Sequence, residues 1–413
     1  MTTTIPTTSP ATNLTEPLPP KQETSSRLLS IDAYRGFVMF LMMAEILHLS
    51  GLAEKFPDSS LCQWLKFHTT HVEWIGCSLH DLIQPSFSFL VGVSLAFSLL
   101  KRFSHQQNVT RILLHAAWRS LLLIGLGIFL RSLHREQTYF TFEDTLTQIG
   151  LGYFPLVLIG LARPYVAWIA TLLILIGYWA LFALYPLPTE GFDMKTVGVP
   201  ADWPHLLQGF EKHWDKNTNP AWAFDRWWLN LFPREQPFEF NRGGYATLSF
   251  IPTLATMLLG LIAGRWLANR STTPSRRIGQ LLAAALICGA VGWLLGFLHL
   301  CPIVKRIWTP SWVLWSGGWC FLLLAVFHLL LDHLKWNRVF FPWVVIGANS
   351  IASYVMAETI APWISENLTK HFGTKPFEML GDPFKPILLG GTTLVCMWLI
   401  LHWMYRNKIF VKI

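Results

Sequence analysis

A series of apolar stretches, each about 20 residues long and bounded by charged residues or by Pro and Gly, dominates this sequence. An α-helix of that length spans the hydrocarbon core of a bilayer. The composition agrees: 52% of the 413 residues are hydrophobic and 14% are charged, against roughly 25% charged residues in a soluble globular protein. The sequence therefore excludes a soluble enzyme and predicts an all-α polytopic membrane protein, a bundle of about ten transmembrane helices. The predicted spans are residues 31–50, 79–100, 111–131, 145–162, 164–185, 245–266, 277–298, 310–333, 339–363 and 386–405.

The basic residues indicate how the chain lies in the membrane. A net charge of +8 is compatible with nucleic-acid binding, but the Lys and Arg residues are scattered between apolar runs in small groups, so we expect no nucleic-acid partner. An even number of spans puts both termini on one side, and the loops of that side are short and carry Lys and Arg next to helix ends. The positive-inside rule then predicts cytoplasmic termini. Loops 51–78, 132–144, 186–244, 299–309 and 364–385 would face outward.

The N-terminal residues and the six cysteines constrain the fold less than the apolar stretches do. Residues 1–26 are rich in Thr and Pro and lack the features of a signal peptide, so we predict a disordered cytoplasmic tail before one transmembrane domain, 27–413, with a long outer loop at 186–244. The six cysteines form no CxxC pair, and we predict no metal site. Only Cys62 and Cys77, which flank a short polar loop, are placed for a bridge.

Ionisable residues inside spans are costly and usually functional or paired. Glu45 and His48 lie three residues apart in the first span, Asp81 opens the second, and Glu358 follows Tyr354 by one turn in the ninth. The predicted topology brings these groups to the outer third of the membrane. Each also has a structural interpretation: Glu45 and His48 can pair with each other, Asp81 can offset the helix dipole, and the Tyr354 and Glu358 stripe can pack helices.

The first outer loop contains His71, in the stretch from His68 to Gly76. A neutral imidazole there can act as a general base or as a nucleophile, with Glu73, Glu45 or Asp81 orienting its other nitrogen. A lone loop histidine more often has no such role, so the pattern by itself leaves both interpretations open.

Two further patterns allow a functional and a structural interpretation. Arg111, His115 and Arg119 form a basic stripe at i, i+4 and i+8 of the third span, which can hold the phosphates of an anionic cofactor or anchor the helix at the cytoplasmic surface. The outer loop is rich in tryptophan, which can stack on a sugar or form an interfacial aromatic belt. The tryptophans are Trp203, Trp214, Trp222, Trp227 and Trp228.

Several segments resemble one family of membrane enzymes. Arg27–Gly36 and His71–Ser94, taken together, look like the transmembrane acetyltransferases related to heparan-α-glucosaminide N-acetyltransferase, and the chain looks like a bacterial-type member. Further similar segments follow in the same order along the chain, up to Glu358. They are Leu146–Tyr153, Asp225-Arg226, Arg242–Leu248, Lys305–Val313 and Gly347–Glu358.

The resemblance implies a reaction and a set of site residues. The family moves an acetyl group from cytoplasmic acetyl-CoA to a glucosamine amine across the membrane, with a His of the first outer loop in the active site, and His71 matches that position. The implied co-substrate is acetyl-CoA, and the implied partners are the lipid bilayer, an amino sugar or glycan acceptor and a second copy in a homodimer. The implied location is a bacterial inner membrane. The candidate catalytic residues are His71, Glu45, Asp81, Asn349 and Glu358, and the candidate cofactor-binding residues are Arg35, Arg111, Arg119 and Gln148.

The sequence leaves the acceptor, the route of transfer and two alternative functions open. Glu45, His48 and Glu73 depart from the family pattern and add ionisable groups beside the candidate histidine, which leaves the acceptor open. His71 could form an acyl-imidazole or deprotonate the acceptor for direct attack. The alternatives to amino-sugar acetylation are O-acetylation of a cell-envelope polysaccharide and a sugar or anion permease that uses the same carboxylates for proton coupling. No convincing internal repeat supports the permease.

Overall fold

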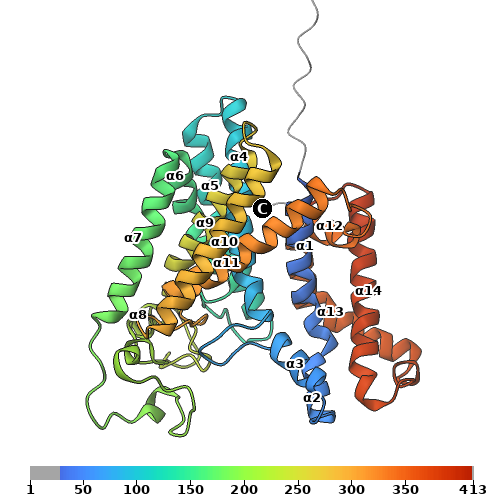
Figure 1. Cartoon of the computed structure of the whole chain (residues 1–413). Helices are drawn as coiled ribbons and strands as arrows, with labels where there is room; N and C mark the ends of the chain where they lie inside the picture. The colour runs from blue at the N-terminus through green and yellow to red at the C-terminus, as the bar shows by residue number, and fades with distance from the viewer. Residues whose placement is uncertain (1–27, 412–413) are drawn as a thin grey trace, which may run out of the picture.

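Every stretch that the sequence predicts as a span is helical in the computed structural model, which describes residues 28–411 (Figure 1). Within those residues, seven helices are each long and apolar enough to cross a membrane, and up to nine spans result if each of two bent helix pairs counts as one. One more apolar helix, α6, has 17 residues. The prediction of an all-α polytopic membrane protein is confirmed. The helices are α1 (Leu29–Met43), α2 (Leu52–Lys55), α3 (Ser60–Thr69), α4 (Ile83–Ser104), α5 (Val109–Ser132), α6 (Thr145–Leu161), α7 (Pro164–Ala183), α8 (Pro220–Trp228), α9 (Phe250–Ala268), α10 (Pro274–Phe297), α11 (Pro310–Phe327), α12 (Phe341–Ala348), α13 (Ser350–Phe372) and α14 (Lys385–Arg406).

Two of the predicted spans are broken. The first continues from α1 as a 3-10 turn over Ala44–Leu47 and then bends by 49° at His48, which has a left-handed backbone with φ 48°. The ninth divides into α12 and α13, which meet at 83° around the non-helical residue Asn349. Each of these two predicted spans is therefore a bent pair of helices, because one residue in each leaves the helical conformation.

Glycines bring the inner helices together at backbone distance. A Cβ atom added at Gly92 of α4 would lie 1.8 Å from the carbonyl oxygen of Met257, and one at Gly260 of α9 would lie 1.9 Å from that of Phe89. Such contacts exclude any larger residue and let dispersion forces hold helices together in lipid. The helix that includes α9 is accordingly the most deeply placed apolar helix, with 83% of its most apolar stretch buried.

The helices α7 and α10, on the outside of the bundle, are mostly exposed. Only 22% of the most apolar stretch of α7 and 11% of that of α10 are buried, although both helices are almost entirely apolar. Exposed apolar surface over the whole length of a helix is expected where lipid is the solvent. The exposed apolar faces of α7 and α10 therefore contact lipid chains and not other helices.

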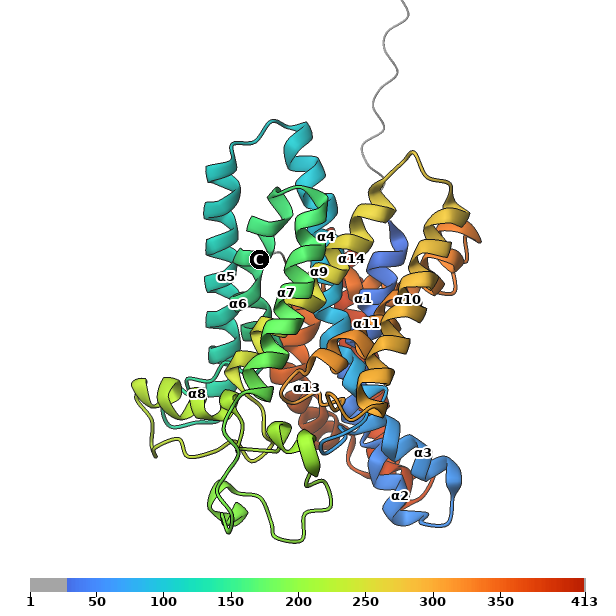
Figure 2. The ribbon, with the colours of Figure 1, turned by 60° about the vertical axis from the view of Figure 1, so that its left-hand side comes forward.

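The two ends of the bundle are formed by different parts of the chain. Figure 1 shows the start of α1 and the end of α14 at one end of the bundle, while Figures 1 and 2 show α2, α3, α8 and the loops between α7 and α9 gathered at the other end. The predicted placement of both termini on one side agrees with this arrangement. The predicted disordered tail, residues 1–26, lies outside the described residues.

A second hydrophobic cluster holds the loops of the α8 end together. It contains Trp74, Tyr178, Trp214 and Val304, which are all nearly inaccessible to solvent and come from four separate parts of the chain. The Trp74 indole donates a hydrogen bond to the carbonyl of Trp214 (3.2 Å). This cluster fixes the first outer loop. The proposed bridge in this loop is absent, since Cys62 and Cys77 are both free thiols.

The glycine contact between α1 and α12 gives a direct test of the fold. A Cβ at Gly36 would lie 1.7 Å from the carbonyl oxygen of Trp343, so Gly36→Ala should push the two helices apart and destabilise the protein by about 2–3 kcal/mol. Gly125→Ala in α5 is the matched control, because nothing lies within 4 Å of the added methyl group. Thermal unfolding in detergent, followed by tryptophan fluorescence, should show a lower midpoint for the first variant only, and equal midpoints would contradict the packing described here.

Candidate active site

The loop that contains His71 is held against the segment that precedes α11. Ile75 and Val304 form an isolated antiparallel bridge, and the Gly76 N–H donates to the carbonyl of Ile303 (3.1 Å). Gly76 has φ 126°, a conformation that L residues with side chains rarely adopt. The first outer loop and the loop before α11, far apart in the sequence, are thereby fixed relative to each other.

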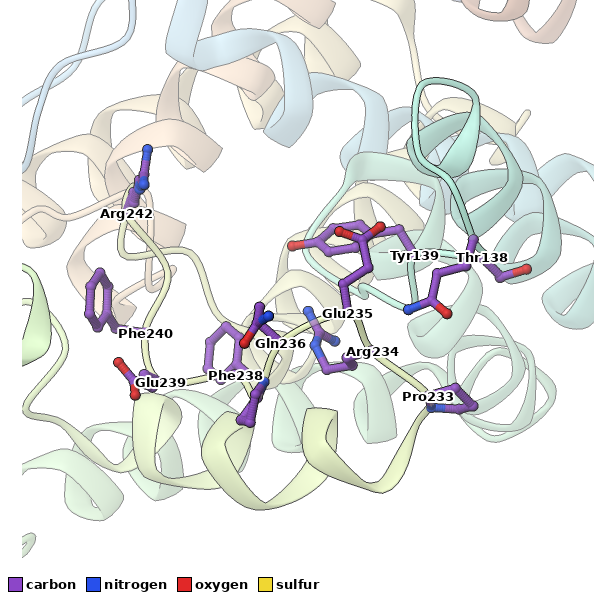
Figure 3. A pocket seen from close by; sticks show the side chains of 12 residues that line it. Thr138, Tyr139, Pro233, Arg234, Glu235, Gln236, Phe238, Glu239, Phe240 and Arg242 are labelled. Atoms are coloured by element: carbon purple, nitrogen blue, oxygen red, sulfur yellow. The ribbon is translucent and has the colours of Figure 1, made fainter.

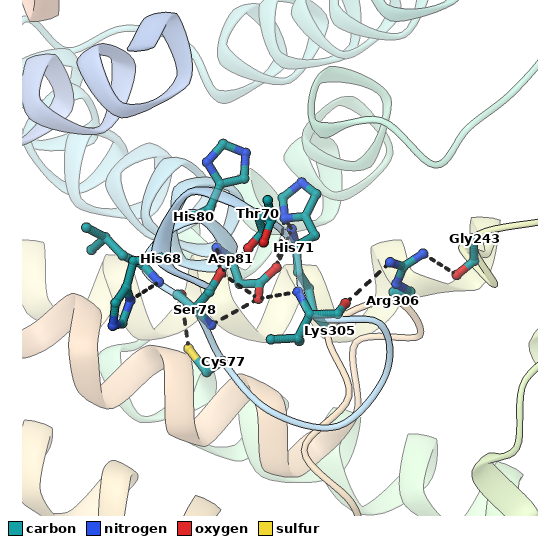
Figure 4. A network of polar contacts seen from close by, with 12 residues as sticks. His68, Thr70, His71, Cys77, Ser78, His80, Asp81, Gly243, Lys305 and Arg306 are labelled. Carbon is teal, nitrogen blue, oxygen red and sulfur yellow. Dashed lines mark hydrogen bonds and ion pairs between the residues drawn. The ribbon is translucent and has the colours of Figure 1, made fainter. Parts of the chain in front are cut away.

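This docking brings three ionisable side chains together (Figure 4). Nδ1 of His71 lies 2.8 Å from Oδ1 of Asp81, and Nζ of Lys305 lies 3.1 Å from the same oxygen and 2.9 Å from His71 Nδ1. The side chains of Asp81 and Lys305 are 0% and 5% exposed, whereas that of His71 is 38% exposed. A buried ion pair thus lies beneath an imidazole that solvent can reach.

Asp81 is anchored by its surroundings. Its second oxygen, Oδ2, accepts hydrogen bonds from the backbone N–H groups of Val72 (3.3 Å) and Ser78 (3.0 Å). The Ser78 hydroxyl accepts a hydrogen bond from the Asp81 N–H in return (3.2 Å), so the two residues form a capping box at the turn before α4. Capping therefore accounts for the contact of Asp81 with Ser78, but not for those with His71 and Lys305. With an ammonium and two N–H groups around it, the carboxylate has the partners that a buried charge requires.

Burial favours the neutral form of His71. Burial lowers the pKa of the imidazole, Asp81 opposes this effect, and the ammonium of Lys305 adds to it. Burial also lowers the pKa of Lys305, an effect that the Asp81 carboxylate opposes. An ionised Asp81 has no proton to donate, so the tautomer that fits this contact carries its hydrogen on Nδ1 of His71 and donates it to Oδ1. In this tautomer the Lys305 ammonium donates to Oδ1 of Asp81 and forms no hydrogen bond with the ring. Nε2 is then left with a free lone pair, which can accept a proton or an acyl group.

Glu45 reaches this group through a second histidine. Its carboxylate lies 2.7 Å from Nε2 of His80, and the rings of His80 and His71 lie 4.5 Å apart. The proposed pairing of Glu45 with His48 is not formed, because the helix ends between them. Glu73 pairs instead with His205 (3.4 Å), so it does not orient His71.

A further group of charges lies toward α13. Glu358 and Tyr354 are within electrostatic reach of Glu45 and of Arg131 at the end of α5. The side chains of Glu45, Glu358 and Arg131 all retain substantial exposure even though they belong to apolar helices. Burial raises the pKa of Glu143, which also interacts with Arg131, to about 7. The structure therefore brings Glu45 and Glu358 into one charged region, as the sequence predicts.

Asn349 does not join this region. It is fully buried at the junction of α12 and α13, where its side-chain amide donates to the carbonyl of Ile409 (2.9 Å) and its oxygen accepts from the N–H of Val411 (3.0 Å). The expectation that Asn349 lines a cavity with Tyr354 and Glu358 is wrong, because both of its polar groups hold the C-terminal backbone in place.

The four candidate cofactor-binding residues do not form one site. The Arg35 guanidinium pairs with Asp32 (3.5 Å) and donates to Ser94 (2.5 Å), and that of Arg119 contacts Tyr153 (3.1 Å). Arg111 is exposed at the start of α5.

Gln148 lies far from Arg111 along the bundle. It is buried near the start of α6, where it donates to the carbonyls of Phe142 (2.6 Å) and Thr247 (3.1 Å). Asp144, just before α6, abuts Gly127 of α5, which lies roughly 24 Å along α5 from Arg111 by the rise per residue. The grouping of Gln148 with Arg111 is therefore wrong.

Sequence reasoning missed Lys305 and His80. Lys305 is separated from His71 by 234 positions, and no local pattern links them. A signal was nevertheless present, since Lys305 opens one of the segments that carry the family resemblance. His80 directly precedes Asp81, and only the orientation of the turn over His80–Leu82 shows that it faces Glu45.

Removing the cation from this cluster should change the titration of His71. In Lys305→Met the repulsion between the ammonium and the imidazolium is lost while Asp81 stays, so the pKa of His71 should rise. Diethyl pyrocarbonate modifies the neutral imidazole, and the pH midpoint of modification, mapped to His71 by mass spectrometry, should therefore move upward. Lys66→Met, which removes an exposed lysine of α3, should leave the midpoint in place. A midpoint that stays or falls in Lys305→Met would count against the assigned electrostatics.

Comparison with known proteins gives a consistent but distant relationship. No family model matches the chain. It is 25% identical over 449 aligned positions to heparan-alpha-glucosaminide N-acetyltransferase of Homo sapiens, an alignment that covers 98% of this chain and 62% of the relative. The enzyme of the same name from Mus musculus is 22% identical over 438 positions, covering 95% and 61%. The chain thus spans about three fifths of the length of the curated relatives it matches. Over nearly its whole length, this membrane protein is a distant relative of the heparan-alpha-glucosaminide N-acetyltransferases.

Proposed function

We propose that this protein is a transmembrane acetyltransferase, which passes an acetyl group from cytoplasmic acetyl-CoA to an amino sugar or glycan acceptor on the outer face of the membrane. The observation that carries the proposal is the His71 cluster: a neutral, partly exposed imidazole held by a buried carboxylate at the end of the bundle that carries the long loops. The distant relationship to N-acetyltransferases supports the same reaction.

The chemistry assigned to His71 uses the lone pair of Nε2. In direct transfer, this nitrogen accepts the proton that the acceptor amine loses as it attacks the thioester carbonyl, and the C–S bond breaks to release the CoA thiolate. In the two-step route, Nε2 itself attacks the carbonyl, the C–S bond breaks to release the CoA thiolate, and an acyl-imidazole forms. The amine then attacks this acetyl group, the bond from carbon to Nε2 breaks, and Nε2 accepts the proton that the amine loses. In both routes the Asp81 carboxylate stabilises the positive charge that develops on the ring.

In this proposal, the exposed carboxylates near His71 bind the acceptor. An amino sugar is cationic until it loses a proton, and the exposed carboxylates of Glu45 and Glu358 would attract it. Glu45 also contacts His80, whose ring centre lies 4.5 Å from that of His71, so an ammonium held there would lie close to the proton acceptor. We assign Glu45 and Glu358 to binding the acceptor and Asp81 to positioning the base.

The proposal also fixes which side of the membrane each end faces. The end of the bundle with the chain termini carries Lys101, Arg102 and Arg111 in and beside a short loop, where the positive-inside rule places the cytoplasm. Acetyl-CoA, which is large and anionic, would reach the protein from that end, so that only the acetyl group needs to pass through the bundle. We place the protein, with both termini inside, in a bacterial inner membrane.

Loss of the imidazole should abolish transfer. We expect His71→Ala to lower acetyl transfer from labelled acetyl-CoA to glucosamine by at least about 100-fold, since it removes the proton or acyl acceptor. His205→Ala, which removes another histidine of the outer loops, is the control and should keep activity within about twofold. Unchanged turnover in His71→Ala would rule out both routes. If wild-type protein neither binds nor consumes acetyl-CoA, the permease becomes the better explanation.

Thiol labelling tests the sidedness independently of activity. In a background without Cys62 and Cys77, we expect a membrane-impermeant maleimide added to intact cells with a permeable outer envelope to label Asp202→Cys in the long loop but not Ser271→Cys between α9 and α10. Both positions should be labelled after the membrane is opened with detergent. Labelling of Ser271→Cys alone in intact cells would reverse the proposed topology.

A further inference from the structure

The outer loops contain a pocket that the proposed reaction does not use (Figure 3). It has a volume of about 310 Å³ and is formed by residues 137–139, which follow α5, and by residues of the segment 233–242. This volume is at the lower end of the range of small-ligand sites, roughly 300–1,000 Å³. The chemistry of its walls indicates which ligand it would take.

The tryptophans of the long loop do not provide a sugar platform themselves. Trp214 is buried in the second hydrophobic cluster, the indole of Trp203 donates to Glu73 (3.3 Å), and that of Trp222 donates to the carbonyl of Glu239 (2.8 Å). Trp227, at 59% exposure, is the most accessible of the five. Most of these rings therefore stabilise the loop, and the pocket lies beside them.

The wall of the pocket is fixed by one arginine. The guanidinium of Arg234 lies 5.1 Å from the ring centre of Tyr139 and 5.5 Å from that of Phe238, and it donates a hydrogen bond to the carbonyl of Phe140 (2.8 Å). These contacts join the two segments that form the pocket. A site that is already assembled loses little conformational entropy when it binds a ligand.

The groups that remain available suit a carbohydrate. Glu235, Gln236 and Glu239 line the pocket with exposed side chains, and they offer two carboxylates and an amide to hydroxyl and amine groups. The half-buried ring of Phe240 adds an apolar surface of the kind that packs against the C–H face of a sugar ring. Opposite charges from Arg242 and the two glutamates leave no single sign of charge that would select a simple ion.

The pocket is connected to the His71 cluster through hydrogen bonds. Arg242 lines the pocket, and the carbonyl of the next residue, Gly243, accepts a hydrogen bond from Arg306 (2.7 Å). The same guanidinium donates to the carbonyl of Val72 (3.3 Å), which adjoins His71 (Figure 4). A glycan whose terminal unit lies at His71 would thus have a second, fixed contact region on the neighbouring outer loops.

We propose that this pocket binds a further sugar unit of the acceptor, beyond the one that is acetylated. The proposal rests on the function proposed above and assigns to this pocket the contact with the rest of a longer acceptor. A single amino sugar would fill only the region near His71.

Binding and transfer with acceptors of two lengths test this inference on the full chain in detergent. Calorimetry should show that the wild-type protein binds a glucosamine tetramer at least about tenfold more tightly than glucosamine, because two additional polar contacts are made. The double variant Gln236→Ala/Glu239→Ala should lose this difference, and it leaves the backbone carbonyl that Trp222 uses in place. The ratio of kcat/KM for the tetramer to that for glucosamine should fall by a similar factor. Glu190→Gln, an exposed position of the same loop outside the pocket, is the matched control.

The outcomes separate the two proposals. The pocket is rejected if wild-type protein binds the tetramer no more tightly than glucosamine, or if the double variant keeps the preference. If the wild-type protein shows the preference and the double variant loses it, but no acetyl group is transferred to either acceptor, the carbohydrate site stands and the acetyltransferase proposal fails.

Discussion

The ion pair between Asp81 and Lys305 is the contact on which the rest of the site depends. Both side chains are almost completely buried, and removing either one would leave an unpaired charge at a cost of several kcal/mol. The pair can form only if the first outer loop and the loop before α11 are correctly docked, so it couples the site to the hydrophobic cluster around Trp74 and Trp214. The position of His71 follows from this pair, and its neutral charge state follows chiefly from burial in the docked loop.

The bundle supplies a rigid frame for that contact. Gly92 and Gly260 let the backbones of α4 and α9 touch, and Gly36 and Gly347 do the same for α1 and α12. The first span breaks at His48, close to Glu45 of the charged region, whereas the break at Asn349 lies against the C-terminal backbone. A membrane protein tolerates a broken helix where the freed backbone groups find hydrogen-bond partners or water. At the second break, the Asn349 side chain bonds to the backbone of the C-terminal segment.

Sequence reasoning worked best where a residue's role was local. The apolar stretches predict every transmembrane helix, because burial in lipid requires about 20 apolar residues whatever the tertiary packing. Asp81 and His71 lie ten residues apart in one loop, and their pairing was among the predicted possibilities. The cofactor grouping failed for the opposite reason: Gln148 and Arg111 share a polar character in apolar surroundings, but α5 and α6 run antiparallel, and the direction of packing separates the two residues.

By itself, then, the sequence determined that this chain is an all-α membrane protein, which of its segments are apolar enough to span, and that a histidine and several carboxylates lie near one face. The tertiary structure decided which of those groups meet. It paired Glu45 with His80, brought Lys305 to His71 across 234 positions, and turned Asn349 toward the C-terminus. Hydrophobic periodicity is a property of consecutive residues and can be read from the chain, whereas a buried ion pair is a property of two loops in space and exists only after the helices have packed.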